Sequence, residues 1–242
     1  MLEGARVIAV VPAFEEAERI ARVVSSMPAC VDHILVVDDA SRDETSVRAC
    51  AVRDPRLEVI VHEKNLGVGA AIVTGYRRAM QLTRQPRDVF VVMAGDGQMD
   101  PHDLPRVVSP VASGRAGYVK GNRFSSPGAW RVMPLQRRVG GEIFSRLTSR
   151  AIGVPISDSQ CGYTAISRDV CGALDLDALW PRYGYPNDLL AKLARAGVVI
   201  EEVTVRPIYA GEKSHLRVWH LARIVHLVGR AWIERARRER DQ

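Results

Sequence analysis

Four short runs rich in valine and isoleucine recur in the first hundred residues, and each ends in polar or glycine- and proline-containing sequence. Their ranges are 6–11, 33–37, 57–61 and 88–93. Runs of this length with such borders are typical of buried β-strands. The stretches between them, 15–27, 43–53 and 68–82, carry apolar residues at helical spacing. This alternation predicts an α/β fold, a doubly wound, mixed but mostly parallel sheet with helices on both faces.

The pattern continues less regularly after residue 93. We expect a helix that begins near Pro101, where proline suits the first turn, and a loop over 125–134. The further expected elements are strands at 117–121 and 197–205 and helices at 134–152, 186–196 and 216–240. Neither a repeat nor a low-complexity linker divides the chain. We therefore predict one domain over 1–215, followed at 216–242 by a basic amphipathic helix that belongs to it or contacts a membrane or partner.

Several classes of protein are disfavoured by the composition. No run approaches the roughly 20 uncharged apolar residues that span a bilayer, and Met1–Arg6 lacks the layout of a signal peptide. The four cysteines form no C-x-x-C pair, which favours reduced thiols in a cytosol. The predicted location is cytoplasmic, or peripheral at the cytoplasmic face of a membrane.

The net charge of +6 is concentrated near the C-terminus. Residues 213–240 hold eight lysines and arginines against two glutamates. Such a segment suits an anionic membrane surface or a phosphate-bearing partner, and a solvated basic helix is the alternative. No nucleic-acid reader motif is present, so nucleic acid is not an expected partner. Oligomeric state is not indicated.

Polar residues follow each predicted strand, where the carboxyl ends of parallel strands bind ligands. The first strand ends in 12–16 (P-A-F-E-E) without G-x-G-x-x-G, which disfavours a dinucleotide site. Glu15 and Glu16 also suit a helix start. The second strand ends in Asp38 and Asp39, adjacent carboxylates that are costly unless they bind a nucleoside or lie near a cation. Asp43 suits a helix cap.

The third and fourth strand ends carry different chemistry. Gly67 and Gly69 precede a helix and would let its backbone approach an anionic ligand closely. Asp96 and Gln98 are alternate oxygen donors after a hydrophobic strand. That arrangement is typical of a site that holds one hard divalent cation together with substrate phosphates.

Seven motifs, in order and spacing, resemble those of family 2 glycosyltransferases with the GT-A fold, closest to the dolichyl-phosphate (polyprenyl-phosphate) mannosyl- and glucosyltransferase branch. Residues 12–16 are similar to that family's P-x-Y-N-E, 38–45 to D-D-x-S-x-D-x-T, and 65–71 to N-x-G-x-G-x-A. Residues 96–98 resemble the second half of D-x-D-x-Q. The later matches are 121–124 to G-S-R-Y, 157–163 to S-D-x-x-x-G-F and 211–215 to the G-x-S-K segment.

The resemblance implies an inverting, metal-dependent transfer of a hexose from a nucleotide sugar such as GDP-mannose or UDP-glucose. Asp96 and Gln98 would hold Mg²⁺ or Mn²⁺, which offsets the charge of the leaving diphosphate. The donor-binding residues that it implies are Pro12, Phe14, Glu16, Asp38, Asp39, Ser41, Asn65, Gly67, Gly69 and Asp96. Three positions depart from the pattern: Ala94 replaces the first aspartate of D-x-D, Thr164 replaces arginine, and Asp188 replaces glutamate.

The acceptor decides which further residues the reaction needs. A polyprenyl phosphate is already an oxyanion, so it needs cationic positioning rather than a base. The candidates are Arg123, Arg131, Arg137, Arg138 and Lys213, and each could instead form a surface ion pair. A hydroxyl acceptor needs a general base, for which Asp158 is the first candidate and Asp188 the second. Asp158 also suits a cap or a loop-stabilising role.

The final helix has apolar residues on one side and arginine and histidine at three- or four-residue steps. It suits a peripheral contact with anionic lipid or, equally, packing on the core. The leading hypothesis is thus hexose transfer to polyprenyl phosphate. The alternatives are transfer to a saccharide hydroxyl in envelope polysaccharide or glycoconjugate assembly, and a weakly active nucleotide-sugar-binding partner of a membrane protein.

Overall fold

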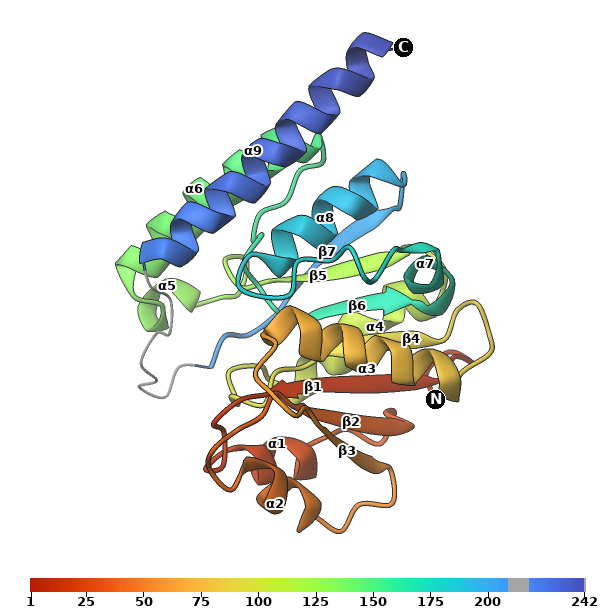
Figure 1. Cartoon of the computed structure of the whole chain (residues 1–242). Helices are drawn as coiled ribbons and strands as arrows, with labels where there is room; N and C mark the ends of the chain where they lie inside the picture. Colours follow the sequence, from red (N-terminus) through yellow and green to blue (C-terminus); the bar gives the residue numbers. More distant parts are fainter. Residues whose placement is uncertain (209–217, 242) are drawn as a thin grey trace.

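The computed structural model describes residues 1–208 and 218–241, and its centre is a seven-stranded sheet in the order β3-β2-β1-β4-β6-β5-β7 (Figure 1). The strands are β1 (Val7–Ala13), β2 (His33–Asp38), β3 (Leu57–Val61), β4 (Val89–Val92), β5 (Tyr118–Asn122), β6 (Thr164–Ser167) and β7 (Ile200–Thr204). The first four run parallel, β5 is parallel to β7, and β6 is antiparallel to both its neighbours. The predicted mixed, mostly parallel sheet is confirmed.

Helices cover both faces of this sheet. They are α1 (Ile20–Ser25), α2 (Thr45–Cys50), α3 (Val68–Leu82), α4 (Leu104–Ala112), α5 (Ala129–Val132), α6 (Leu135–Ile152), α7 (Arg168–Ala173), α8 (Tyr185–Arg195) and α9 (Val218–Asp241), with a short 3-10 helix, Pro101–Asp103. One buried cluster joins the sheet to α1, α2 and α4, and a second joins it to α3, α7 and α8. The central strands β1 and β2 are buried on both sides, which explains their unbroken apolar runs.

Some elements differ from the sequence expectation. The predicted helix over 15–27 begins only at Ile20, because the amides of residues 15–17 bond to another loop and Glu15 has a positive φ of 57°. The expected loop at 125–134 contains the single turn α5. Strand β6 and helix α7 were not expected; β6 (T-A-I-S) lacks the run of valine and isoleucine that marks the equally short β4 (V-F-V-V).

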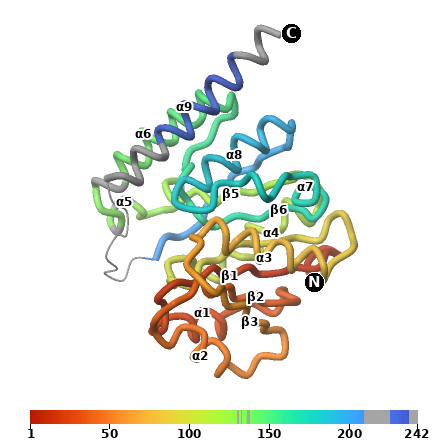
Figure 2. Tube along the Cα trace, in the orientation of Figure 1, coloured from red at the N-terminus to blue at the C-terminus, as the bar shows by residue number. Residues whose placement is uncertain are grey.

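Helices α6 and α9 lie side by side at one side of the sheet, as both Figure 1 and Figure 2 show. They meet through a third cluster in which Val228 and Ala231 of α9 pack on Ala151 of α6. Ala191 of α8 borders the same cluster, so α9 is also tied to the main body. Within the described ranges, no helix combines the length and the apolar character needed to cross a bilayer.

Helix α3 lies unusually close to β1 at Gly75. A Cβ atom built at this glycine would stand 2.2 Å from Cγ1 of Val10. That separation is far below a van der Waals contact, so the absence of a side chain sets how closely the helix approaches the sheet. The same close contact helps to position the N-terminus of α3 relative to the carboxyl end of β1.

We predict that Gly75→Ala destabilises the fold by about 1–3 kcal/mol, because the added methyl group overpacks the α3–β1 contact. Gly140→Ala in α6 is the matched control, since nothing lies within 4 Å of its Cβ position. The control should be neutral or stabilising by up to about 1 kcal/mol, because alanine favours helix. Urea denaturation measures both; a Gly75→Ala protein as stable as the wild type would contradict this packing.

Candidate functional site

The tip of β1 is the centre of the candidate site, and the ends of its two neighbouring strands flank it. The amide of Asp39, just after β2, donates to the carbonyl of Ala13 at 2.9 Å. On the other side, the amide of Gly95, just after β4, donates to the carbonyl of Pro12 at 3.0 Å. The loops that carry Asp39 and Asp96 therefore border the same strand end, as the fold class predicted.

A brace of three hydrogen bonds joins the loop after β1 to the loop after β2. The amide of Glu15 donates to Oγ of Ser41 at 2.9 Å. The next amide, of Glu16, donates to Oγ1 of Thr45 at 2.8 Å, and the third, of Ala17, to Oδ2 of Asp43 at 3.1 Å. Three consecutive amides are thus paired by alternate side chains of the neighbouring loop, which fixes Phe14 and Glu16 in place.

Carboxylates support this brace from within the second loop. Asp38, which is buried, accepts from both the amide and the hydroxyl of Ser41. Asp43 accepts from the amide and hydroxyl of Thr45. Burial alone would raise the pKa of Asp43, but the hydrogen bonds from Thr45 and from the amide of Ala17 outweigh it and lower the pKa. Asp38 and Ser41, assigned to the donor by resemblance, therefore act on the loop itself in this structure.

Two residues in the brace have left-handed backbone conformations. Glu15 has a φ of 57° and Ala40 a φ of 60°, although neither is glycine. Such conformations cost on the order of 1 kcal/mol and persist only where surrounding contacts hold them, often at functional sites. The brace provides those contacts for Glu15.

Asp39 holds the loop after β3. Its buried carboxylate accepts from the amides of Leu66 and Gly67 at 2.8 and 2.7 Å. Oδ1 also lies 2.8 Å from Nδ1 of His62, and Nδ2 of Asn65 donates to the backbone carbonyl of Asp39 at 3.3 Å. The pair Asp38–Asp39 is therefore explained by two separate sets of partners, Ser41 in the same loop for Asp38 and the loop after β3 for Asp39.

The two glycines of the next loop accommodate the chain's own segment 180–182. A Cβ at Gly67 would stand 2.5 Å from the carbonyl oxygen of Pro181, and one at Gly69 would stand 2.4 Å from that of Trp180. The amide of Ala70 donates to Pro181 at 3.1 Å, and Arg182 bonds to the backbone and side chain of Asn65. The close approach that the sequence predicted for a ligand is made here by backbone of segment 180–182.

Asp96 and Gln98 lie on a half-exposed turn beside the tip of β1. Oδ1 of Asp96 accepts from the amide of Gln98 at 3.0 Å, and Gly97 between them has a positive φ of 71°. Tyr183, the residue after segment 180–182, interacts electrostatically with Asp96 and Glu16. Burial raises the pKa of Tyr183, and the negative charges of Asp96 and Glu16 raise it further. Glu16, Asp96 and Tyr183 therefore lie within electrostatic reach of one another.

This turn fits a cation that takes most of its ligands from elsewhere. Among the residues that the structure describes, no three His, Cys, Asp or Glu side chains gather as a metal cage. Mg²⁺ sites commonly use only one or two carboxylates and complete the shell with substrate phosphates and water. Asp96 and Gln98 are oxygen donors that suit this type of site, with Ala94 contributing no ligand atom from its side chain.

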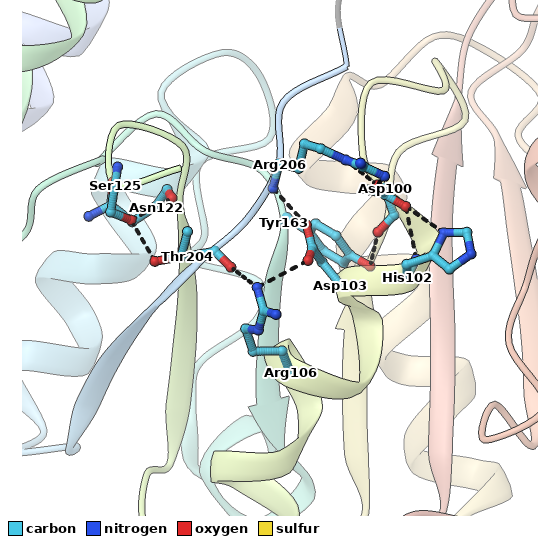
Figure 3. Close-up of polar contacts among 9 residues, drawn as sticks. All are labelled: Asp100, His102, Asp103, Arg106, Asn122, Ser125, Tyr163, Thr204 and Arg206. Carbon is cyan, nitrogen blue, oxygen red and sulfur yellow. Dashed lines mark hydrogen bonds and ion pairs between the residues drawn. The ribbon is translucent and has the colours of Figure 1, made fainter. Parts of the chain in front are cut away.

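The segment after β7 fixes Gln98 from the opposite side. The amide of Ile208 donates to the carbonyl of Gln98 at 3.1 Å, and Met99 pairs with Pro207. Arg206 anchors this segment: its guanidinium bonds to Asp100 and its amide donates to Asp103 at 2.6 Å (Figure 3). Burial alone would raise the pKa of Asp100, but hydrogen bonds from His102 and Arg206 lower it.

Asp158 and Arg123 form a buried ion pair. Asp158 is fully buried and accepts from Nε, Nη2 and the amide of Arg123 at 2.7, 2.9 and 3.1 Å. Burial alone would raise the pKa of Asp158, but Arg123, together with the nearby charge of Lys120, lowers it. Glu202 holds the amides of Ser157 and Asp158. Asp158 is therefore an ionised carboxylate with three bonds to one arginine.

Asp188 is engaged in the same manner. It lies in the first turn of α8 and is buried. Oδ2 accepts from the amide of Trp180 at 2.9 Å, Oδ1 accepts from Arg230 of α9, and Lys192 lies 3.5 Å away. The structure thus gives both residues nominated as a general base cationic partners.

The remaining nominated residues are placed as follows. Phe14 is exposed just after the end of β1, and Pro12, two residues earlier in the strand, is buried. Arg131 on α5 and Arg138 on α6 are exposed, and Arg138 pairs with Glu142 at 3.3 Å. Lys213 and the side chain of Arg137 lie outside the described residues. The role of Arg131 and Arg138 at the acceptor phosphate stays a prediction.

Sequence reasoning missed several residues that shape the site. Thr45, His62, Trp180, Tyr183 and Arg230 each contact or approach a nominated residue. Thr45 belongs to a quoted motif and could have been recognised from its spacing. The others come from segments without a motif, and only folding brings them to the site.

Comparison with known families agrees with this geometry. The family model described as Glycosyl transferase family 2 matches residues 8–175. An undecaprenyl-phosphate mannosyltransferase from Micrococcus luteus is 31% identical over 208 residues, which cover 83% of this chain and 82% of that protein. A polyprenol monophosphomannose synthase from Mycolicibacterium smegmatis is 32% identical over 206 residues, covering 83% and 76%.

Two further comparisons concern an archaeal relative and the fold. The UDP-N-acetylglucosamine–dolichyl-phosphate N-acetylglucosaminyltransferase of Methanococcus voltae is 29% identical over 215 residues, covering 83% of this chain and 84% of that protein. Among solved structures, glucosyl-3-phosphoglycerate synthase from Mycobacterium tuberculosis superposes with a TM-score of 0.69 at 22% identity, covering 94% of this chain and 80% of that one. At that identity the likeness establishes the fold, a GT-A fold, and the expected fold class is confirmed.

The Asp158–Arg123 pair generates a prediction on stability and pH. The folded pKa of Asp158 is lowered, so its stabilising contribution is present above the unfolded pKa of about 3.9 and is lost as the pH falls through the folded pKa. Asp158→Asn leaves Arg123 without its buried counter-charge and should cost about 3–5 kcal/mol at pH 7. As the pH falls below about 4, the difference between the variant and the wild type should shrink, and it should disappear only below the folded pKa.

Denaturant titrations between pH 3 and pH 7 measure this difference. Asp177→Asn is the control, because its side chain is 87% exposed and its pair with Arg77 is a surface pair. The control should stay within about 0.5 kcal/mol of the wild type at every pH. A pH-independent cost of Asp158→Asn would contradict the ionised, paired state.

Proposed function

The chain belongs to glycosyl transferase family 2, and from that premise we propose that it transfers a hexose, with inversion, from a nucleoside-diphosphate sugar to a polyprenyl phosphate. Of the three relatives named above, two are named for dolichyl phosphate or undecaprenyl phosphate and the third for a polyprenol monophosphomannose. The donor that we propose is of the GDP-mannose or UDP-glucose type.

The observation that carries this proposal is the state of the two candidate bases. A saccharide hydroxyl must lose its proton during attack, so an enzyme that uses one needs a free base within reach. Asp158 is held by Arg123, and Asp188 by Arg230 and the amide of Trp180. A phosphate acceptor is an oxyanion before it binds and needs no base. Transfer to a saccharide hydroxyl is therefore the less favoured alternative.

The chain's residues would divide the work between the two substrates. Phe14 is exposed where a nucleobase could stack, and Glu16, Asp96 and Gln98 border the same strand tip. Asp96 and Gln98 would hold Mg²⁺ or Mn²⁺, which supplies positive charge to the leaving diphosphate. Arg123 would present part of its guanidinium to the acceptor phosphate, since its side chain is 25% exposed while it holds Asp158. Arg131 and Arg138 are further candidates, as are Arg137 and Lys213.

The exposed apolar side chains of α6 and α9 support a peripheral contact with an anionic membrane. On α6, Leu135, Val139 and Ile143 recur every fourth residue and are exposed. On α9, Val225, Trp232 and Ile233 are exposed. They border the seam between the two helices, because Ile143 lies one turn before Leu147 of α6 and Trp232 lies one turn after Val228 of α9, and both Leu147 and Val228 belong to the cluster that joins the helices.

The charge of these helices complements such a surface. Together α6 and α9 contain ten arginines against four acidic residues, a net charge of +6 that equals that of the entire chain. The rest of the protein is therefore neutral on balance, and its positive field comes from these two helices. Apolar side chains bordered by arginines are typical of surfaces that lie in the headgroup region. We keep 216–242 as a segment that contacts the membrane while packing on the main domain.

Activity tests the proposed reaction. We expect sugar transfer from a GDP- or UDP-sugar to a short polyprenyl phosphate with Mn²⁺ or Mg²⁺. In Asp96→Asn we expect turnover to fall by more than about 100-fold, since mutation even of a residue that only hydrogen-bonds to a metal ligand lowers activity or metal affinity 10–100-fold. Asp177→Asn is the matched control and should retain activity. Transfer to free saccharides but not to lipid phosphate would favour the hydroxyl alternative. Donor binding without turnover would favour the weakly active partner of a membrane protein.

Vesicle binding tests the membrane contact. We expect the protein to bind phosphatidylglycerol-containing vesicles at low salt and Ile143→Glu or Trp232→Glu to weaken that binding by roughly tenfold or more, because each loses about 1.5–3 kcal/mol of apolar burial. Val47→Glu is the control, since Val47 is 66% exposed on α2, outside this surface. Equal losses in all three variants, or equal binding to neutral vesicles, would count against the contact.

A further inference from the structure

The segment Trp180–Tyr183 contacts the loop 65–70, which leads into α3. Its carbonyls at Trp180 and Pro181 fill the space over Gly67 and Gly69, and Pro181 accepts from the amide of Ala70. Nη2 of Arg182 donates to the backbone carbonyl of Asn65 at 3.2 Å. Tyr183 reaches the region of Asp96 and Glu16. The position of this segment therefore influences the conformation of the loop 65–70, which Asp39 also holds through the amides of Leu66 and Gly67.

The backbone of this segment is attached to the rest of the protein through Asp188. Trp180 donates its amide to Oδ2 of Asp188 at 2.9 Å, and its indole Nε1 donates to the carbonyl of Tyr183 at 3.0 Å. Asp188 is 2% exposed at its side chain, so its charge is costly without a partner. The nearest positive charge is that of Arg230 on α9, which bonds to Oδ1 of Asp188. Lys192 on α8 is more distant, at 3.5 Å from Oδ2.

Arg230 reaches Asp188 because α9 packs against both α6 and α8. Val228 and Ala231, on either side of Arg230 in the helix, are buried in the cluster that includes Ala191 of α8. Glu234, one turn later in α9, lies 3.6 Å from Nε of Arg230 and pairs with Arg195 of α8. The guanidinium is thus oriented by one carboxylate on its own helix and directed at another on α8.

We propose that Arg230 and Asp188 are positioning residues for the donor site: Arg230 on α9 holds Asp188, Asp188 holds the amide of Trp180, and segment 180–183 in turn holds the loop 65–70. This rests on the proposed function and adds to it a physical link between the helix pair that would meet the membrane and the loop beside the donor. A shift of α9 would act on donor binding through a buried carboxylate, with no direct contact between α9 and the donor.

The link predicts that loss of the Arg230 charge loosens a loop to which Arg230 makes no bond. In Arg230→Met, which keeps the aliphatic stem, the amides of residues 66–70 should exchange with deuterium faster than in the wild type. The affinity for the nucleotide sugar should fall on the order of tenfold, the size of a typical coupling between sites. Arg230→Lys should restore part of both, since it returns the charge without the planar fork.

A double-mutant cycle separates this link from a general loss of packing. Asp188→Asn keeps the shape of the side chain but removes its charge, and the double variant Asp188→Asn/Arg230→Met should weaken donor binding no more than either single variant. Arg235→Met is the control on the same helix, because Arg235 contacts the backbone of Arg150 rather than Asp188. It should lower the melting temperature slightly and leave donor affinity unchanged.

Hydrogen exchange and donor titration, both well below the melting temperature of each variant, decide the proposal. Faster exchange at 66–70 together with weaker donor binding in Arg230→Met, absent in Arg235→Met, supports it. Unchanged exchange, or faster exchange with wild-type donor affinity, overturns it. If the wild type bound no nucleotide sugar at all, the proposed function would fail, and exchange at 66–70 alone would then decide whether Arg230 holds this loop.

Discussion

At the carboxyl edge of a parallel sheet, the backbone amides of the loops have no partner within the sheet. The structure of the candidate site depends on the side chains and carbonyls that accept hydrogen bonds from these amides. The amides of residues 15–17 bond to the loop after β2, and those of Leu66 and Gly67 bond to Asp39. The amide of Ala70 bonds to Pro181. Because these bonds join the loops after β1, β2 and β3 to one another and to the segment before α8, they form one connected rim beside the tip of β1.

The residues of the family motifs play two different parts in this rim. Asp38, Asp39 and Ser41 form hydrogen bonds that hold the loops after β1, β2 and β3. Phe14, Asp96 and Gln98 remain partly exposed on the rim. The first kind makes the second possible, since an exposed side chain can meet a ligand in a fixed place only if its backbone is held. The link through Arg230 extends this support from the rim to α9.

Elements with a run of β-branched apolar residues or a clear helical period were predictable from the sequence. Strand 57–61 and helix 68–82 have the expected bounds. The helix after β1 begins five residues late because its first amides are taken by the Ser41–Thr45 loop, a tertiary contact that overrides local preference. Strand β6 has four residues and pairs antiparallel between β4 and β5. Its place depends on partners over 40 residues away, which no local pattern encodes.

The sequence by itself determined the fold class and the edge of the sheet where polar motifs converge, because strand periodicity and motif order are properties of the chain. Only the tertiary structure decided what each motif residue holds. Asp158 meets Arg123 across 35 residues, Asp188 meets Arg230 across 42, and Asn65 meets Arg182 across 117. A hydrogen bond or ion pair requires atoms within about 3–4 Å, and spacing along the chain does not reveal which distant groups folding brings so close.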